Sequence, residues 1–327
     1  MAFPPEDAAA RSVGLMAFVG LSVAIFMLLV PLPFEGRAGA VLGDVAHAPL
    51  FGSITIATLF LWHRLRPLDS FGREWYGRMA LVAVCVFLGG ILMEFAQTMT
   101  GRTAALHDAI ANGLGVIAAV AICFALLNLR YHSQRRWVSV IATGVAMSMV
   151  GVAMARPVQV GMDIVAAHQA FPMLGSFESE MELTRWYFDD CLAERTDEHT
   201  TDGNHSLRIL VRRSEHPAAT LIETVPDWSD VKTLELDVTL AGSYPTSLEM
   251  VLKVMDEDRA DYHADTSRKS FALEPGKTTH LVMSREEILT GPDTRNLDLT
   301  RIQMVSLQLI SPQTSSFVDI DRIVVTR

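Results

Sequence analysis

Seven polar residues with chemically useful side chains stand in or beside strongly apolar stretches in the first part of this 327-residue chain. They are Asp44, His47, Glu94, Gln97, Arg102, Asp108 and Asn112. Histidine and carboxylate side chains exchange protons or ligate metal ions, and an arginine binds phosphate or carboxylate groups. A carboxylate placed in hydrocarbon is strongly unfavourable unless it is paired. We therefore expect these side chains to face the interior of a helix bundle or a cavity.

Three interpretations of this polar set are open. In the first, Glu94 pairs with Arg102 or His47 and only holds the helices together. In the second, which we favour, polar groups gathered at one depth of the membrane form a functional pocket. In the third, the His, Glu and Asp side chains bind a metal ion, although the sequence lacks a tight ligand motif such as His-Glu-x-x-His. The sequence shows neither a Ser-His-Asp signature nor a glycine-rich phosphate loop.

Five stretches with almost no formal charge predict transmembrane helices at 12–34, 45–63, 79–100, 109–129 and 137–155. Each approaches the roughly 20 residues that a helix needs to cross about 30 Å of hydrocarbon. Half of the residues are hydrophobic, which also favours a membrane protein. The first stretch ends in Pro31-Leu32-Pro33 rather than in a small-x-small cleavage site, so it predicts an uncleaved anchor.

The arginines predict the orientation of these helices, because cytoplasmic loops carry an excess of positive charge. One side of the predicted helices has Arg11, Arg64, Arg66, Arg73, Arg78, Arg130, Arg135 and Arg136, and the other has Arg37, Arg102 and Arg156. The N-terminus is therefore predicted to be cytoplasmic, and the chain beyond residue 156 to lie outside. This orientation places the polar set near the outer surface, with Asp108, Asn112 and Gly115 on one helical stripe.

The two halves of the chain differ in charge. Residues 1–156 contain 11 arginines, no lysine and 8 acidic residues, whereas residues 157–327 contain 16 basic and 29 acidic residues. This division predicts two domains in two environments. The net charge of −10 comes from the second half, and the absence of a basic patch excludes nucleic acid as a partner.

The order and spacing of the polar residues resemble a known family. The pattern reads Asp44-Val-Ala-His47, Glu94-x-x-Gln97, Arg102 and Asp108-x-x-x-Asn112-x-x-Gly115. Over roughly residues 15–130 it is similar to the VanZ-like family, except that Val45 stands where that family usually has lysine. The resemblance implies a place of action in the cell envelope, in a family linked to resistance against the glycopeptide antibiotic teicoplanin. It implies no particular reaction.

Beyond a connector at 157–175, the hydrophobic pattern changes from helical to alternating. Segments at 233–240, 247–254, 305–310 and 317–325 predict strands, and turn signals separate them. Residues 176–327 are therefore predicted to form an antiparallel β-sandwich of the jelly-roll type. The predicted fold class is a five-helix transmembrane bundle over residues 1–156, followed by this all-β sandwich.

The second half also resembles jelly-roll, carbohydrate-binding-like domains in the order of its features. These features are Phe177-Glu178, Asp202-Gly203-Asn204, Asp227-Trp228, Pro275-Gly276 and Asp319-Ile320-Asp321. The resemblance implies a structural Ca²⁺ ion held by Glu178 and Asp319, with two solvated acids as the alternative. No other cofactor is implied. Sugars stack on exposed aromatic rings, so Tyr244 and Tyr262, near predicted turns, are candidate glycan contacts.

The favoured hypothesis is a multi-pass protein of the bacterial inner membrane that binds a lipid-linked or envelope glycan at the outer leaflet. It would act in polysaccharide assembly or glycopeptide resistance, with Arg102 meeting a phosphate or another anion. The predicted partners are the lipid bilayer, such a glycan or polysaccharide, and envelope-assembly proteins. Two alternatives are an enzyme that uses His47 and Glu94 as acid and base on that substrate, and a purely structural scaffold.

Overall fold

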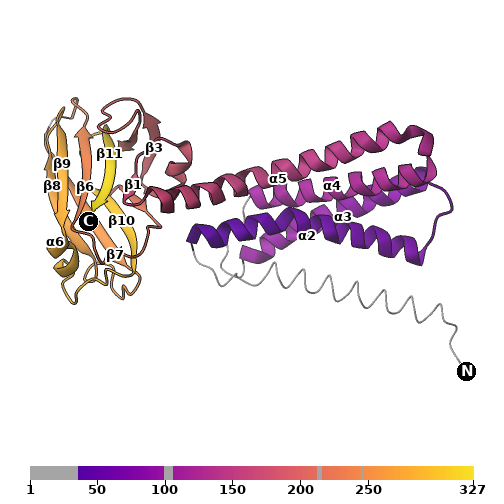
Figure 1. Ribbon diagram of the computed structural model, residues 1–327, viewed down its shortest axis with the longest axis horizontal. Helices are drawn as coiled ribbons and strands as arrows, with labels where there is room; N and C mark the ends of the chain where they lie inside the picture. Colours follow the sequence, from indigo (N-terminus) through magenta and orange to yellow (C-terminus); the bar gives the residue numbers. More distant parts are fainter. Residues whose placement is uncertain (1–35, 99–105, 212–215, 245) are drawn as a thin grey trace, which may run out of the picture. The chain divides into compact units, whose positions relative to one another are not determined.

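The computed structural model describes residues 36–98, 106–211, 216–244 and 246–327. The chain divides into two compact units, with the division between Gly161 and Met162. In the described residues the first unit is helical, and the second consists mainly of strands (Figure 1). The predicted span at 12–34 lies outside the described residues. The predicted bundle of five helices therefore corresponds to four helices in the part of the chain that the structure describes.

Four long helices carry the predicted spans that lie in the described ranges. They are α2 (Gly36–Leu65), α3 (Arg73–Thr98), α4 (Leu106–Tyr131) and α5 (Arg136–Ala170), with the short 3-10 turn η1 (Ser133–Arg135) before α5. Each helix is long and apolar enough to cross a membrane. Large apolar side chains are exposed along all four helices, as expected where lipid rather than water is the neighbour.

Helix α5 is longer than the predicted span. The sequence predicts a connector from residue 157, but the helix continues through Pro157 to Ala170. A proline removes one backbone donor from a helix and tends to bend the helix. The helix can nevertheless continue beyond the proline when the turns on both sides keep their hydrogen bonds. The predicted boundary at residue 156 therefore lies inside a helix.

Small residues let α2 and α4 approach each other closely, and this is the most extensive contact between the four described helices. A Cβ atom added at Gly115 would lie 2.1 Å from the backbone oxygen of Ala48. A Cβ atom at Gly52 would lie 3.2 Å from the backbone oxygen of Gly115. No side chain larger than hydrogen fits at Gly115 with the helices at this spacing. The close approach brings the polar residues of the two helices within reach of one another.

Two antiparallel sheets form the second unit. The first, sheet A, has the strand order β3 (Cys191–Thr196), β4 (Ser206–Val211), β11 (Ser316–Thr326), β6 (Thr233–Leu240) and β9 (Thr278–Ser284), and β1 (Met173–Gly175) also pairs with β11. The second, sheet B, has the order β2 (Trp186–Asp189), β5 (Ala218–Leu221), β10 (Ile302–Ile310), β7 (Leu248–Asp256) and β8 (Ser267–Leu273). The short helices η2 (Glu180–Arg185) and α6 (Arg285–Thr290) lie between strands along the chain.

The predicted alternation of strand residues is confirmed. In β6 the even-numbered residues from Leu234 to Leu240 are fully buried, and in β7 the even-numbered residues from Leu248 to Val254 are buried in the same way. Residues of both sheets contribute to one hydrophobic core, which also contains the fully buried Trp228. The structure thus has the predicted antiparallel sandwich, in which side chains on alternate positions of each strand turn away from the core.

A capping box begins α6 and supplies a pH-dependent contribution to stability. The Ser284 hydroxyl and the Glu287 carboxylate each bond the other residue's backbone amide, as this N-terminal motif requires. Lys269, whose Nζ lies 2.7 Å from Glu287 Oε1, and the bonds from Ser284 lower the pKa of Glu287 to about 2. Its charged form is therefore preferred in the folded state. This stabilisation is complete above about pH 4.5 and is lost as the pH falls toward 2.

We expect Glu287→Gln to lower the thermal stability of the full chain in detergent at pH 7 and to change it little near pH 2. The glutamine retains the cap hydrogen bonds but loses the ion pair with Lys269. The difference in thermal stability between the wild type and the variant therefore measures what the charge of Glu287 contributes. Glu274→Gln, whose carboxylate is exposed, serves as the matched control. An equal loss of stability at both pH values would contradict this account of Glu287.

Candidate functional site

Three helices bring polar side chains together in the first unit. His47 of α2, Glu94 of α3 and Asn112 of α4 are all buried. His47 Nδ1 lies 3.0 Å from Asn112 Oδ1, and Asn112 Nδ2 donates to Glu94 Oε1 at 3.3 Å. His47 Nδ1 also lies 3.9 Å from the same Glu94 oxygen. Residues far apart in the sequence thus form one hydrogen-bonded chain, which we call the polar cluster.

The hydrogen bonds of Asn112 hold the ring of His47 in one orientation. Asn112 Nδ2 donates to Glu94, so the amide oxygen of Asn112 faces His47 and accepts a hydrogen bond from His47 Nδ1. The other ring nitrogen, Nε2, lies toward Asp108. An imidazole held in one orientation can exchange a proton or ligate a metal ion through its other nitrogen.

Asp108 of α4 lies next to His47 Nε2. Its Oδ1 atom is 3.7 Å from His47 Nε2 and 3.5 Å from Nε2 of His107, the preceding residue. Both distances are too long for a hydrogen bond. Asp108 Oδ1 is buried and accepts no hydrogen bond from the described residues. His107 Nε2 also lies 3.6 Å from Oδ1 of Asp44 on α2, so a second histidine and a second aspartate adjoin Asp108.

The structure therefore brings five of the seven sequence-predicted polar residues to one end of the α2, α3 and α4 bundle. The other two are Gln97, whose side chain is not described although its backbone belongs to α3, and Arg102, which lies outside the described residues. Sequence reasoning missed His107. The sequence contains one indication, namely that His107 directly precedes Asp108. This indication was not enough, because the structure is needed to show that Asp44, 63 residues earlier, lies beside His107.

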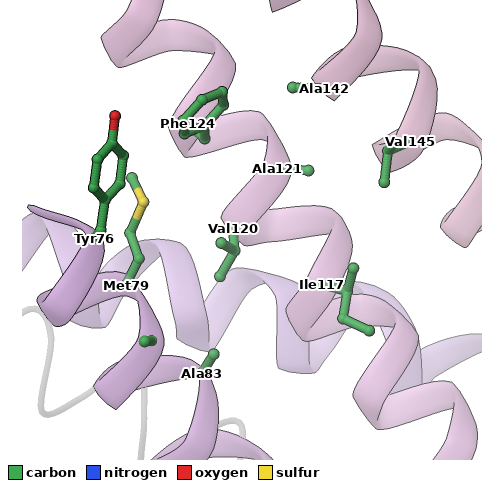
Figure 2. A pocket seen from close by; sticks show the side chains of 10 residues that line it. Tyr76, Met79, Ala83, Ile117, Val120, Ala121, Phe124, Ala142 and Val145 are labelled. Atoms are coloured by element: carbon green, nitrogen blue, oxygen red, sulfur yellow. The ribbon is translucent and has the colours of Figure 1, made fainter. Parts of the chain in front are cut away.

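An apolar groove lies toward the other end of the same bundle. It has a volume of about 470 Å³ and is lined by residues of α3, α4 and α5. Figure 2 shows Tyr76 and Met79 of α3 beside Phe124 of α4, with Ala142 and Val145 of α5 across from them. On α3 the groove ends at Ala83, about 16 Å along the helix from Glu94. The groove is therefore separate from the polar cluster, and hydrocarbon is the medium that matches its lining.

A row of side chains crosses the outer face of sheet B in the second unit. Tyr187, Thr220, Ser306, Lys253 and Arg268 are successive register partners on β2, β5, β10, β7 and β8. Each alternates with core residues on its strand, so all five point away from the core. The hydroxyl oxygens of Thr220 and Ser306 are 2.8 Å apart. Five strands at about 4.8 Å spacing make this outer row about 19 Å long.

The two predicted glycan-contact tyrosines differ in position. Tyr244 is buried, and its hydroxyl oxygen accepts a hydrogen bond from the backbone N–H of Gln313 at 3.0 Å. The prediction for Tyr244 is therefore wrong, because the turn folds the ring into the sandwich core. Tyr262 is 45% exposed, and its ring lies 5.1 Å from Lys253 Nζ and 5.5 Å from Arg259 Cζ. It thus adjoins the outer row.

The predicted calcium ligands are bound by protein donors instead. Asp319 is buried on β11 and accepts two hydrogen bonds from Arg208 at 2.8 Å, and its Oδ2 is 2.6 Å from Nδ1 of His199. The exposed Glu178 accepts from the backbone amides of Asn204 and His205 at 2.7 and 2.9 Å. These amide bonds lower the pKa of Glu178. Glu178 and Asp319 share no group of three or more metal-capable side chains in the described ranges. A guanidinium already pairs with Asp319, and the calcium pair stays a prediction.

Comparisons with known proteins concern the second unit. A structure of an exo-beta-agarase is 20% identical, with a TM-score of 0.39, and the match covers 47% of this chain and 24% of that one. The family 11 carbohydrate-binding module from Clostridium thermocellum is 13% identical over 47% of this chain and 93% of its own, with a TM-score of 0.36. A family 30 carbohydrate-binding module of a Clostridium thermocellum cellulase is 10% identical over 43% and 91%, with a TM-score of 0.35.

The chain is similar to these structures, but at these identities and TM-scores the similarity carries no argument about the fold of the second unit or about what it binds. No family model matches the chain, and no curated protein matches it. The VanZ-like resemblance consequently depends on the motif residues alone, and the functional argument depends on the side chains described above.

Proposed function

We propose that this chain is a membrane-anchored glycan-binding protein of the bacterial cell envelope, and that sheet B binds a polysaccharide carrying negative charge. Lys253 is the observation that carries the proposal. It is only 8% exposed, yet it lies on the outer face of its sheet rather than in the core. It forms no hydrogen bond or ion pair with any residue in the described ranges. Its ammonium nitrogen keeps contact with solvent, while most of the residue is buried. A partly desolvated ammonium group without an anion is unfavourable, so an anionic ligand would stabilise it.

The surroundings of Lys253 suit a charged sugar. Burial, together with the nearby charge of Arg268, lowers the pKa of Lys253, and an anion bound between the two cations would reverse that effect. Among the residues that the structure describes, Arg268 pairs only with Asp293, and both side chains are exposed, so this weak pair can open to a ligand. Glu249 and Asp189 also belong to strands of sheet B but lie in other rows, away from the position where Lys253 and Arg268 adjoin.

Aromatic rings complete the proposed binding face. Tyr187 is 60% exposed at the β2 end of the outer row, and Tyr262 is exposed beside Lys253. Aromatic side chains present apolar faces with polar tips, which is the surface on which sugar rings pack. Thr220 lies between these ends and is half-buried, and its hydroxyl group bonds that of the buried Ser306. The arrangement can therefore hold a glycan of several sugar units across the strands.

The helical unit supports a location in the envelope. Four described helices can cross a membrane, and the arginine distribution favours a cytoplasmic N-terminus with the second unit outside. We propose that the polar cluster then lies toward the outer leaflet of the inner membrane, where the lipid-linked end of a glycan would be present. A role in polysaccharide assembly or in glycopeptide resistance is what the VanZ-like motif adds to this proposal.

Binding of charged and neutral glycans to the full-length protein in lipid nanodiscs tests the proposal. We expect Lys253→Met to weaken binding of acidic glycans at least about tenfold, because it removes a partly desolvated cation. Lys277→Met, at an exposed turn lysine, is the matched control and should bind as the wild type does. Tyr187→Ala should weaken binding of any glycan that spans the face. Unchanged binding in both Lys253→Met and Tyr187→Ala would exclude sheet B as the binding face.

A further inference from the structure

The charge arrangement around Asp108 is incomplete with the described side chains alone. Asp108 is 8% exposed, and its Oδ1 atom is buried without a hydrogen-bond donor in the described ranges. On one side it faces the Nε2 atom of His47 at 3.7 Å, beyond hydrogen-bond distance. Asp108 Oδ1 therefore has close neighbours but no donor among the described residues. A cation bound to Asp108 Oδ1 would supply the missing partner.

The other side of Asp108 offers ligands for that cation. One ligand atom from each of Asp44, His107 and Asp108 lies within 4.8 Å of the other two. The His107 Nε2 atom is 3.6 Å from Asp44 Oδ1 and 3.5 Å from Asp108 Oδ1. Two ligands that each lie about 2.0–2.2 Å from a tetrahedral ion are separated by about 3.3–3.6 Å. The observed distances thus match shared coordination better than hydrogen bonding.

We propose that Asp44, His107 and Asp108 bind a divalent transition-metal ion of the zinc class between α2 and α4. One imidazole and two carboxylates form a nitrogen and oxygen set that suits such ions. The two carboxylates balance the charge of the ion. His107 and Asp44 are partly exposed, so the site has a path for the ion to enter and room for a water or a ligand in the fourth position.

The polar cluster forms the buried side of this site. Asn112 bonds both His47 and Glu94, and this holds the His47 ring with its Nε2 atom 3.7 Å from Asp108 Oδ1. The bonds of the cluster fix the wall beside Asp108 without reaching the proposed ligands themselves. The close contact of Gly115 with Ala48 keeps α2 and α4 at the spacing that places Asp44 beside His107. The proposal does not depend on glycan binding by sheet B.

The test uses full-length protein purified in detergent through a tag without histidine, stripped with a chelator and titrated with Zn²⁺ or Co²⁺ alone. We expect one ion per chain, and a Co²⁺ visible spectrum typical of a four-coordinate nitrogen and oxygen site. His107→Gln and Asp108→Asn should each lower the affinity at least about tenfold. His132→Gln and Asp69→Asn change the same residue types at exposed positions of the same unit, and they should bind as the wild type does.

His107→Gln keeps the test decisive if Asp108→Asn fails to fold, because His107 is partly exposed in the first turn of α4. A Zn²⁺-dependent rise in the thermal stability of the wild type, absent from His107→Gln, would support the site independently of the spectrum. Absence of stoichiometric binding by the wild type would overturn the proposal. Equal affinity in the wild type and His107→Gln would overturn it as well.

Discussion

Replacing Asp319 by Ala is expected to destabilise sheet A by about 3–5 kcal/mol, because it leaves a partly buried guanidinium without its main partner. Asp319 is only 3% exposed and accepts two hydrogen bonds from Arg208, which joins β11 to β4. The carboxylate raises the pKa of Arg208, so the guanidinium stays charged at any pH at which the protein folds. The substitution also removes the carboxylate oxygen of Asp319 that lies 2.6 Å from Nδ1 of His199. After the substitution, the exposed Glu198 is the only acidic residue in the described part of the chain that still pairs with Arg208.

Exchange of the β4 and β11 backbone amides with solvent in the full-length protein measures this loss as the free energy of opening. Glu274→Ala removes an exposed carboxylate that pairs with Lys277, and it should change the same quantity by less than about 1 kcal/mol. The double variant Asp319→Leu with Arg208→Met should recover much of the loss, because it removes both charges. A loss for Asp319→Ala as small as that of the control would contradict the assigned role of this pair.

Gly115→Ala is expected to destabilise the helical unit by about 1–3 kcal/mol and to open the polar cluster. The added methyl group would lie 2.1 Å from the backbone oxygen of Ala48, so α2 and α4 must separate. Separation lengthens the 3.0 Å contact between His47 and Asn112, which joins the same two helices. The obstacle is a backbone atom. For this reason, trimming the neighbour with Ala48→Gly should not restore stability.

Thermal unfolding of the full chain in detergent measures the effect of Gly115→Ala. Gly144→Ala on α5 is the matched control, since a Cβ atom there would meet nothing within 4 Å. Alanine at that site should leave stability unchanged or raise it by up to about 1 kcal/mol, because alanine is the better helix former. If Gly115→Ala behaves like Gly144→Ala, the close approach of α2 and α4 is not a requirement of the bundle.

Much of the architecture could be predicted from the sequence because its determinants are local. The alternation in Thr233–Leu240 gave the bounds of β6, since a strand with one buried face needs an apolar residue at every second position. Charge-free stretches near 20 residues similarly predicted the helices α2 to α4. Helix α5 exceeded its prediction because a proline such as Pro157 need not end a long helix.

The candidate sites were less predictable, because their contacts join residues far apart in the sequence. Helical spacing and the arginine pattern were sufficient to expect His47, Glu94 and Asn112 at one depth. They could not show that Asn112 bridges the other two. Tyr244 was a candidate glycan contact because it lies near a predicted turn. Its burial could not be predicted, because the burial of a turn residue depends on how the whole sandwich packs. Lys253 had no signal, since its charge is unusual only when its burial is known.

The central claim is that sheet B binds a polysaccharide through the negative charge that the polysaccharide carries. The most direct measurement titrates the full-length protein in nanodiscs with one uronic-acid polysaccharide and with the same polymer after chemical reduction of its carboxyl groups. Binding to Lys253 and Arg268 predicts saturable binding of the charged polymer that weakens with added salt and is lost after reduction. Equal binding of both polymers, or binding of neither, would contradict the claim.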